Sequence, residues 1–271
     1  MSPSWRDEIG AYLAADRVLL VRAGRGLHRP PLAETCCPIV PPAADWPTAI
    51  ETLSEQLARP EWGRAAVRVV VADRWVRYAV VPWSDALGSA EEQSAHAREL
   101  LLGRFGEALA DWRLSVADAP PGQARLACAL PAALLDGLRA AVDGQGRRLA
   151  SVQAQLIAGY NDWRHRFAGG ATAWFVSVED GTLTALRTDA RGVSRVHAVR
   201  VDADWARELR RLQTMSRVAA GGADPDRMYV DVPLALRGLL GTSPATWEWL
   251  EPDEAPGTTM HRLGCLRRKT A

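Results

Sequence analysis

The chain has 271 residues, of which 48% are hydrophobic and 24% are charged, and its formal net charge is +1. This composition excludes fibrous and disordered proteins and provides a core for one large domain or two small ones. The balanced charge argues against the positive field by which most nucleic-acid-binding proteins attract their ligand. The longest apolar stretch, residues 126–135, is interrupted by Pro131 and is far shorter than the roughly 20 residues of a membrane-spanning helix. Because the N-terminus also has no apolar run typical of a secretory signal, we expect a cytoplasmic protein.

The beginning of the chain alternates short apolar runs with turns and a helical pattern. Residues 9–13 and 17–23 are predicted strands, joined by a turn at residues 14–16. Apolar residues at helical spacing predict a helix over residues 49–57, and the continuous apolar run at residues 67–71 predicts a buried strand. This order of meander, helix and strand is typical of an α/β protein.

The middle of the chain continues with strand and helix patterns. They predict an extended segment, a helix, two strands, a helix, a short strand and a last helix, at residues 75–81, 84–106, 112–116, 125–130, 132–142, 149–152 and 155–166. Gly169-Gly170 then marks the best domain boundary. We therefore expect a first domain over residues 1–168, with an inserted subdomain at about residues 75–118.

A second meander follows this boundary. Its predicted strands are residues 173–178, 183–188 and 194–201, and Asp180-Gly181 between the first two is a strong hairpin signal. The later patterns predict a helix from residue 205, a strand at residues 228–232 and a short helix at residues 233–240. We expect a second domain over residues 169–241 and a C-terminal tail over residues 242–271.

The stretch from Val67 to Asn161 carries an ordered set of motifs. They are the strand at residues 67–71, Val76-Arg77-Tyr78 leading to Pro82, a strand ending in Ala129-Leu130-Pro131, the helix at residues 132–142, a turn at Gly144 or Gly146, the strand at residues 149–152 and a helix beginning near Ala154. In this order the stretch resembles the actin-like ATPase fold, in the version of the PilM family of type IV pilus assembly proteins, the cytoplasmic part of type II secretion L proteins and the cell-division protein FtsA. The resemblance implies an α/β, ribonuclease H-like duplicated fold with an inserted small subdomain.

The chain departs from this family where a nucleotide would bind. The family holds phosphates on two hairpins rich in glycine and aspartate and receives adenine at a Gly-Gly pair, because backbone N–H groups must approach the anion. Here the first hairpin turns through Ala14-Ala15-Asp16, the second turns at Glu179-Asp180-Gly181, and the late strand ends in Val232-Pro233. The remaining length also leaves no room for a full second lobe. We expect a reduced second lobe that has lost nucleotide chemistry.

Other motifs for catalysis or metal binding are absent from the sequence. There is no P-loop, G-x-S-x-G, H-E-x-x-H or dinucleotide motif, and the five histidines are scattered. Cys36-Cys37 provides neither an ordinary disulfide nor a C-x-x-C metal knuckle. Glu179 with Asp180 could be the relic of a metal-binding pair, although a plain Asp-Gly turn is the favoured interpretation. We expect no catalytic residue, no cofactor and no metal site.

The best candidates for binding a partner are Trp75, Arg77 and Tyr78. In an extended segment Trp75 and Arg77 share one face, while Val76 and Tyr78 share the other. One face is expected to be buried, and the other is a candidate interaction surface because Trp, Tyr and Arg dominate protein–protein hot spots. The resemblance also places a partner beside the inserted subdomain, near this segment.

The resemblance implies a non-catalytic cytoplasmic scaffold in type IV pilus or type II secretion assembly. Its expected partner is the cytoplasmic tail of an inner-membrane protein or the motor ATPase. One alternative is an active actin-like ATPase that uses Asp16, Glu179 and Asp180. A second alternative is a nucleic-acid-binding regulator that uses a row of arginines, Arg187, Arg191, Arg195 and Arg200. The sequence leaves the identity of the partner, the choice between pilus and secretion, and the oligomeric state open.

Overall fold

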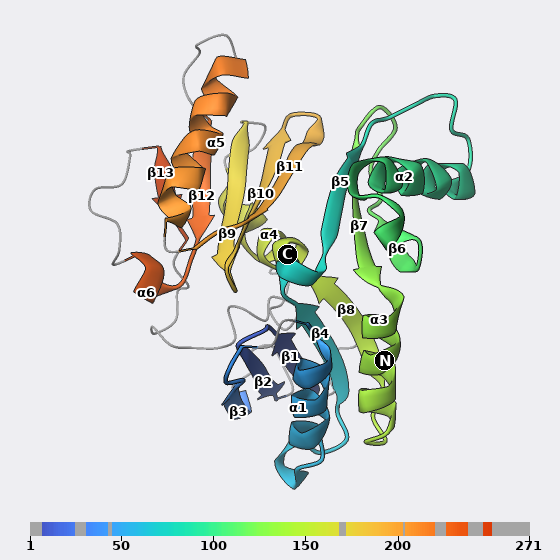
Figure 1. Cartoon of the computed structure of the whole chain (residues 1–271), viewed down its shortest axis with the longest axis vertical. Coiled ribbons are helices and arrows are strands. Elements are labelled where there is room, and N and C mark those ends of the chain that lie inside the picture. Colours follow the sequence, from blue (N-terminus) through green and yellow to red (C-terminus); the bar gives the residue numbers. More distant parts are fainter. Residues whose placement is uncertain are drawn as a thin grey trace. The chain divides into compact units, whose positions relative to one another are not determined.

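The computed structural model of the chain contains two compact units (Figure 1). The residues that it describes are 7–24, 31–42, 45–167, 172–202, 204–219, 226–237 and 246–250. Within these ranges, unit 1 comprises residues 7–75 and 130–162, and unit 2 comprises residues 76–129 and 163–250. The predicted boundary at Gly169-Gly170 lies outside the described residues.

Unit 1 is built on a five-stranded sheet. Its strands are β1 (Glu8–Leu13), β2 (Arg17–Ala23), β3 (Pro31–Pro38), β4 (Ala66–Val71) and β8 (Leu149–Ala154). They lie in the order β3-β2-β1-β4-β8; β1, β2 and β3 are antiparallel, whereas β4 and β8 run parallel to β1. All of β1 is buried, and so is most of β4, which explains why both strands appear in the sequence as nearly continuous apolar runs.

Three α-helices accompany this sheet: α1 (Pro47–Leu57), α3 (Ala132–Asp143) and α4 (Gln155–Trp163). The buried residues of α1 include Ala49, Leu53 and Leu57, which recur every fourth position and form one apolar stripe. Helix α1 packs against α3, and a Cβ atom at Gly137 would lie 2.9 Å from the Cδ1 atom of Ile50. Gly137 therefore allows the two helices to approach closely, although glycine disfavours a helix interior.

A small three-stranded sheet is inserted between β4 and α3. It contains β5 (Arg77–Val81), β6 (Trp112–Val116) and β7 (Arg125–Pro131), in the order β5-β7-β6, and is accompanied by α2 (Ala90–Phe105). A capping box between Ser89 and Glu92 fixes the start of α2. The sequence predicts that the insertion ends near residue 118, whereas the sheet extends to β7. Since β7 is the middle strand, its mostly buried run resembles a strand of a main sheet.

Unit 2 also contains a five-stranded sheet. Its strands are β9 (Ala173–Glu179), β10 (Thr182–Asp189), β11 (Gly192–Arg200), β12 (Arg227–Asp231) and β13 (Trp247–Trp249). They lie in the order β11-β10-β9-β12-β13, with β9, β10 and β11 antiparallel and β12 and β13 parallel to β9. The strand order and directions of the first sheet are thus repeated. The duplication confirms the predicted α/β, ribonuclease H-like fold.

Helices α5 (Trp205–Ala219) and α6 (Leu234–Arg237) accompany this second sheet, and α5 lies along it in Figure 1. Within the described residues this half carries no insertion like the three-stranded sheet. The described residues also include four short 3-10 turns, namely η2 (Pro60–Trp62), η3 (Asp73–Trp75), η4 (Glu107–Leu109) and η5 (Arg164–Arg166).

The last described strand, β13, lies within the segment that the sequence predicts to be a C-terminal tail. The sequence predicts a tail from residue 242, whereas Trp247–Trp249 forms β13 in register with β12. Trp249 packs edge-on against Trp205, with 6.5 Å between ring centroids, and Trp247 belongs to the core of this sheet. A strand of three residues is too short to show a period of two in the sequence, so only its pairing with β12 identifies it. The rest of the predicted tail lies outside the described residues.

Candidate functional site

The turn between β1 and β2 has no glycine that would admit a phosphate group. Ala14 and Ala15 are completely buried, and the Ala14 N–H donates to the Arg17 carbonyl over 2.9 Å. Asp16 forms an ion pair with Arg17 over 2.6 Å. Two buried methyl groups and an internal hydrogen bond therefore occupy the position where the actin-like family exposes backbone N–H groups.

The turn between β9 and β10 is a two-residue hairpin connection. Asp180 and Gly181 both have positive φ, 50° and 64°, as in the type I′ turn that suits a two-residue hairpin. Glu179 and Thr182 flank the turn and are almost completely buried. Among the residues that the structure describes, no group of three or more His, Cys, Asp or Glu side chains could hold a metal ion. The geometry is that of the plain Asp-Gly turn.

The end of β12 is closed by side chains in place of the adenine-binding glycines. Val232 is 3% exposed and packs in the core with Trp174 and Met228. Pro233 follows, and α6 begins at the next residue. At the first and third positions where the family binds nucleotide, buried side chains thus fill the space. At the second position, the connection is a short two-residue turn.

Asp73 and Gln155 are buried polar side chains of unit 1 that lie at the start of α4. No sequence pattern marks either residue as functional. The Asp73 carboxylate accepts a hydrogen bond from the Leu156 N–H over 3.0 Å, which satisfies a donor in the first turn of the helix. Gln155 is 2% exposed, and its Oε1 atom has no hydrogen-bond partner among the described residues. Asp73 lies two residues after the end of β4 and 83 residues before Leu156, so no local pattern connects it with the start of α4.

The predicted partner-binding residues differ strongly in exposure. Trp75 is 5% exposed and Tyr78 is 2% exposed, so both side chains contribute to the interior. Trp75 lies in η3, which precedes the extended strand, and the expected alternation of faces therefore begins only at Arg77. Any direct contact with a partner through these three residues would fall mainly on Arg77.

The guanidinium of Arg77 lies over two aromatic rings. It is 5.5 Å from the Trp112 ring centroid and 5.9 Å from that of Phe105, and its Nη1 atom donates to the Val76 carbonyl over 2.8 Å. Burial and the nearby charge of Arg200 lower its pKa below the ordinary value. Arg77 therefore stabilises the small sheet through cation–π contacts and keeps part of its surface accessible.

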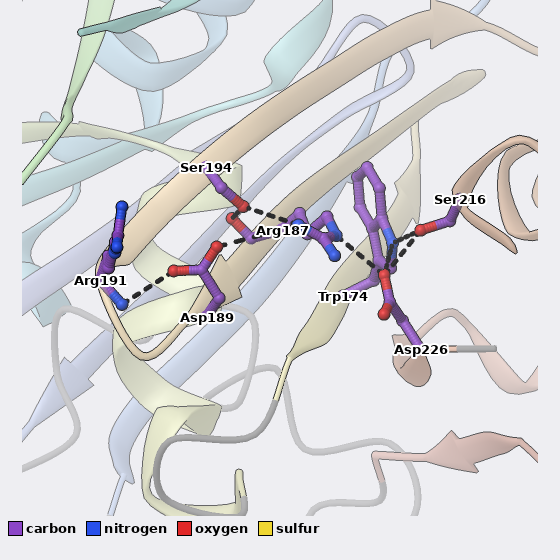
Figure 2. Close-up of polar contacts among 7 residues, drawn as sticks. All are labelled: Trp174, Arg187, Asp189, Arg191, Ser194, Ser216 and Asp226. Atoms are coloured by element: carbon purple, nitrogen blue, oxygen red, sulfur yellow. Dashed lines mark hydrogen bonds and ion pairs between the residues drawn. The ribbon is translucent and has the colours of Figure 1, made fainter. Parts of the chain in front are cut away.

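A polar network stabilises unit 2 around Asp226. Figure 2 shows its carboxylate facing Trp174, Arg187 and Ser216, which donate to Oδ2 over 3.1, 2.8 and 2.6 Å. Burial raises the pKa of Asp226, but the hydrogen bonds from Arg187 and Ser216 outweigh this effect and hold the pKa below the ordinary value. The network joins β9, β10, α5 and the start of β12.

The Asp226 network engages one of the four arginines in the predicted row. Arg187 is engaged by Asp226 and also forms an ion pair with Asp189 at 3.8 Å. Arg191, Arg195 and Arg200 are exposed on the β10–β11 hairpin. The row is therefore not a uniform basic surface, because one of its members has a structural role.

A surface groove lies in unit 1 between α3 and the edge strand β8. It has a volume of about 390 Å³. Its lining residues are Leu135, Arg139, Asp143, Arg148, Leu149, Ala150, Ser151 and Val152. Because β8 is the last strand of its sheet, its outer edge offers backbone groups to which an extended peptide could add. No sequence motif marks this surface.

The two sheets of matching order, with the small sheet inserted between β4 and α3, define the actin-like fold. Solved structures confirm it: the "PilM-PilN type IV pilus biogenesis complex" matches at a TM-score of 0.63 and 14% identity, covering 90% of this chain and 88% of the other. The cytoplasmic domain of EpsL, an inner-membrane component of the Vibrio cholerae type II secretion system, matches at 0.59 and 13%, covering 95% and 92%. A Bacteroides thetaiotaomicron protein of actin-like ATPase fold and unknown function matches at 0.55 and 11%, covering 86% and 84%.

No family model and no curated protein matches the sequence. The similarity of the chain to these solved structures is therefore one of fold. Among the described residues, none of the helices has the length and apolar character needed to cross a membrane.

Proposed function

We propose that the chain is a non-catalytic cytoplasmic scaffold of a type IV pilus or type II secretion machine. It binds the cytoplasmic tail of an inner-membrane partner, or the motor ATPase, and is held at the inner membrane through that partner. The observation that supports this proposal is the agreement of fold with the PilM-PilN complex and the EpsL cytoplasmic domain over 88% and 92% of those chains.

The loss of nucleotide chemistry is supported by the three closed positions. Ala14 and Ala15 fill the first turn, and Val232 fills the end of β12. The active-ATPase alternative is supported by a different observation: Gln155 Oε1 and Asp16 Oδ1, both in unit 1, are buried and have no hydrogen-bond partner within the described part of the chain. Buried polar atoms without partners are rare and can mark a ligand.

Titration calorimetry with Mg-ATP separates the scaffold from the ATPase. We expect no binding heat at micromolar protein concentrations and no release of phosphate. Micromolar binding with turnover would overturn the non-catalytic part of the proposal. A Gln155→Ala variant would then identify the site, because loss of turnover in that variant is expected only if the Gln155 side chain faces the nucleotide.

Binding to a partner is tested by capture on immobilised peptides. The probes are the cytoplasmic tails of the inner-membrane assembly proteins encoded beside this chain, and tails of unrelated membrane proteins serve as controls. We expect one neighbouring tail to capture the chain. Failure of every neighbouring tail, and of the neighbouring motor ATPase, would contradict the scaffold function.

Variants then locate the surface that binds the tail. Arg77→Ala removes the accessible member of the predicted surface, and Arg113→Ala, an exposed arginine of the same small sheet, is its matched control. We expect weaker capture by Arg77→Ala alone. If Arg139→Glu weakens capture and Arg77→Ala does not, the tail binds at the groove between α3 and β8, which Arg139 lines.

The nucleic-acid alternative predicts a different result. DNA binding through Arg191, Arg195 and Arg200 would weaken steeply as the salt concentration rises. We expect no salt-dependent association with duplex DNA, because the acidic residues of the chain balance its basic ones and Arg187 is already paired. Salt-dependent binding that Arg195→Glu abolishes would support the alternative.

A further inference from the structure

Helix α5 presents a broad exposed face to solvent. We call it the α5 outer face; it consists of Arg207, Arg210, Arg211, Thr214, Met215, Arg217 and Val218. The opposite face carries Trp205, Leu209 and Leu212, which are buried in the core of the second sheet. Since α5 is fixed by this buried face, the side chains of the outer face project from a rigid helix.

Three of the four arginines on the α5 outer face have no acidic partner. Arg207, Arg210 and Arg217 form no ion pair among the described residues, whereas Arg211 does. Glu208 is the only acidic residue within the helix, and it is already engaged by Arg211 at 2.6 Å and by His197 at 3.0 Å. The hydrogen bond from Arg211 lowers the pKa of Glu208 below the ordinary value, so that this carboxylate stays ionised and paired.

Apolar side chains are exposed among these arginines. Met215 is 46% exposed and Val218 is 71% exposed, and they are two of the four large hydrophobic residues that are exposed in the described part of the chain. Arg211 donates to the Met215 sulfur over 3.2 Å, which holds a cationic and an apolar side chain together on the surface. Exposed aliphatic groups beside unpaired arginines are typical of helices that lie at a membrane interface.

We propose that the α5 outer face binds directly to an anionic lipid surface. Arg207, Arg210 and Arg217 attract the headgroups, while Met215 and Val218 enter the boundary between headgroups and acyl chains. The cations of the α5 outer face are spread around its two apolar side chains. A continuous anionic surface complements this arrangement better than a single acidic residue of a protein does. This proposal goes beyond the scaffold function, since it requires no protein partner and would hold the chain at the membrane by itself.

Vesicle sedimentation of the full chain tests the proposal. The probes are vesicles of phosphatidylcholine alone and of phosphatidylcholine mixed with phosphatidylglycerol, at low and at physiological salt. We expect binding only to the anionic vesicles, with weaker binding at the higher salt concentration. Absence of binding to anionic vesicles, or equal binding to both compositions, would overturn the proposal whatever the result of the peptide capture.

Variants locate the bound surface. Each arginine near the membrane contributes about fivefold to binding, so the double variant Arg210→Glu/Arg217→Glu should lose most of it. The matched control is Arg191→Glu/Arg195→Glu, which makes the same charge change at exposed positions of the β10–β11 hairpin. Equal loss in both double variants would mean a non-specific charge effect and overturn the assignment to α5.

A Val218→Ser variant keeps the charge and isolates the apolar contribution. It should weaken vesicle binding while leaving the salt dependence unchanged, because the arginines remain. Circular dichroism establishes that each variant is folded.

Soluble poly-glutamate is the last probe. If it binds the α5 outer face more tightly than the anionic vesicles do, the surface recognises an acidic protein segment and the lipid proposal is wrong.

Discussion

The two five-stranded sheets have the same strand order but are stabilised in different ways. The first ends in β8, which has six residues, and its core is mainly aliphatic, with completely buried side chains such as Leu13, Leu53 and Val69. The second ends in β13, which has three residues, and its core is rich in tryptophan. A shared topology therefore does not require a shared kind of core.

The difference follows from the length of the last strand. A strand of three residues contributes few backbone hydrogen bonds and little area, so large aromatic side chains and a buried carboxylate network connect the elements of the second sheet. We therefore expect the second sheet to depend on a few residues, and the first to distribute its stability over many.

The largest expected effect is that of Trp205→Ala. Trp205 is 1% exposed in the core of the second sheet, and its truncation should destabilise unit 2 by roughly 4 kcal/mol. Hydrogen exchange on the folded protein should show loss of protection in unit 2 and little change in unit 1. Leu53→Ala, in the core of the first sheet, should give the opposite pattern; simultaneous loss of protection in both units would mean that the two sheets unfold together.

The next effect concerns the polar network. Asp226→Asn keeps the shape of the side chain but removes the charge that Arg187 and Ser216 bind, and it should cost about 2 kcal/mol of unfolding free energy in urea titrations. Asp189→Asn is the control, because its pair with Arg187 is longer and more exposed, and it should cost less than about 0.5 kcal/mol.

The same network predicts a dependence on pH. Since the pKa of Asp226 is lowered in the folded chain, its contribution is complete above the unfolded value, about 3.9, and is lost as the pH falls through the lower folded value. The stability difference between the wild type and Asp226→Asn should therefore shrink as the pH is lowered below about 4. A constant difference across this range would show that Asp226 is not bound as a carboxylate.

The smallest expected effects are at two glycines. Gly181→Ala places a Cβ at φ 64° in the β9–β10 turn and should destabilise the second sheet by about 1 kcal/mol. Gly103→Ala lies inside α2, where a Cβ meets nothing within 4 Å, and should stabilise the chain by about 0.5 kcal/mol. Thermal unfolding monitored by circular dichroism measures both; a neutral Gly181→Ala would mean that this turn tolerates distortion.

Much of the fold could be predicted from local patterns. The Asp180-Gly181 turn predicts the β9–β10 hairpin, and the spacing of Trp205, Leu209 and Leu212 predicts the buried face of α5, because both signals lie within one element. The predicted end of the insertion near residue 118 leaves β7 outside it, because the apolar run of this strand fits the middle of either sheet. Only its partners β5 and β6 show to which sheet it belongs.

The candidate site could be predicted only in part. The absence of glycine at Ala14-Ala15-Asp16 is evident in the sequence, and the structure adds that these alanines are buried. The burial of Trp75 and Tyr78 could not be predicted, because aromatic residues are equally typical of cores and of interaction surfaces. The partner-binding role of Arg77 stays a prediction.

The sequence by itself determined the order of most elements, though not β3 or β13, together with the duplicated α/β plan and the departure from the nucleotide-binding pattern. These features depend on periodicity, turn residues and glycine positions near one another in the chain. Only the tertiary structure decided that Trp247–Trp249 completes the second sheet and that Asp226 joins β9, β10 and α5. The physical reason is that strand pairing and buried polar contacts join residues far apart in sequence, whose attraction no local pattern records.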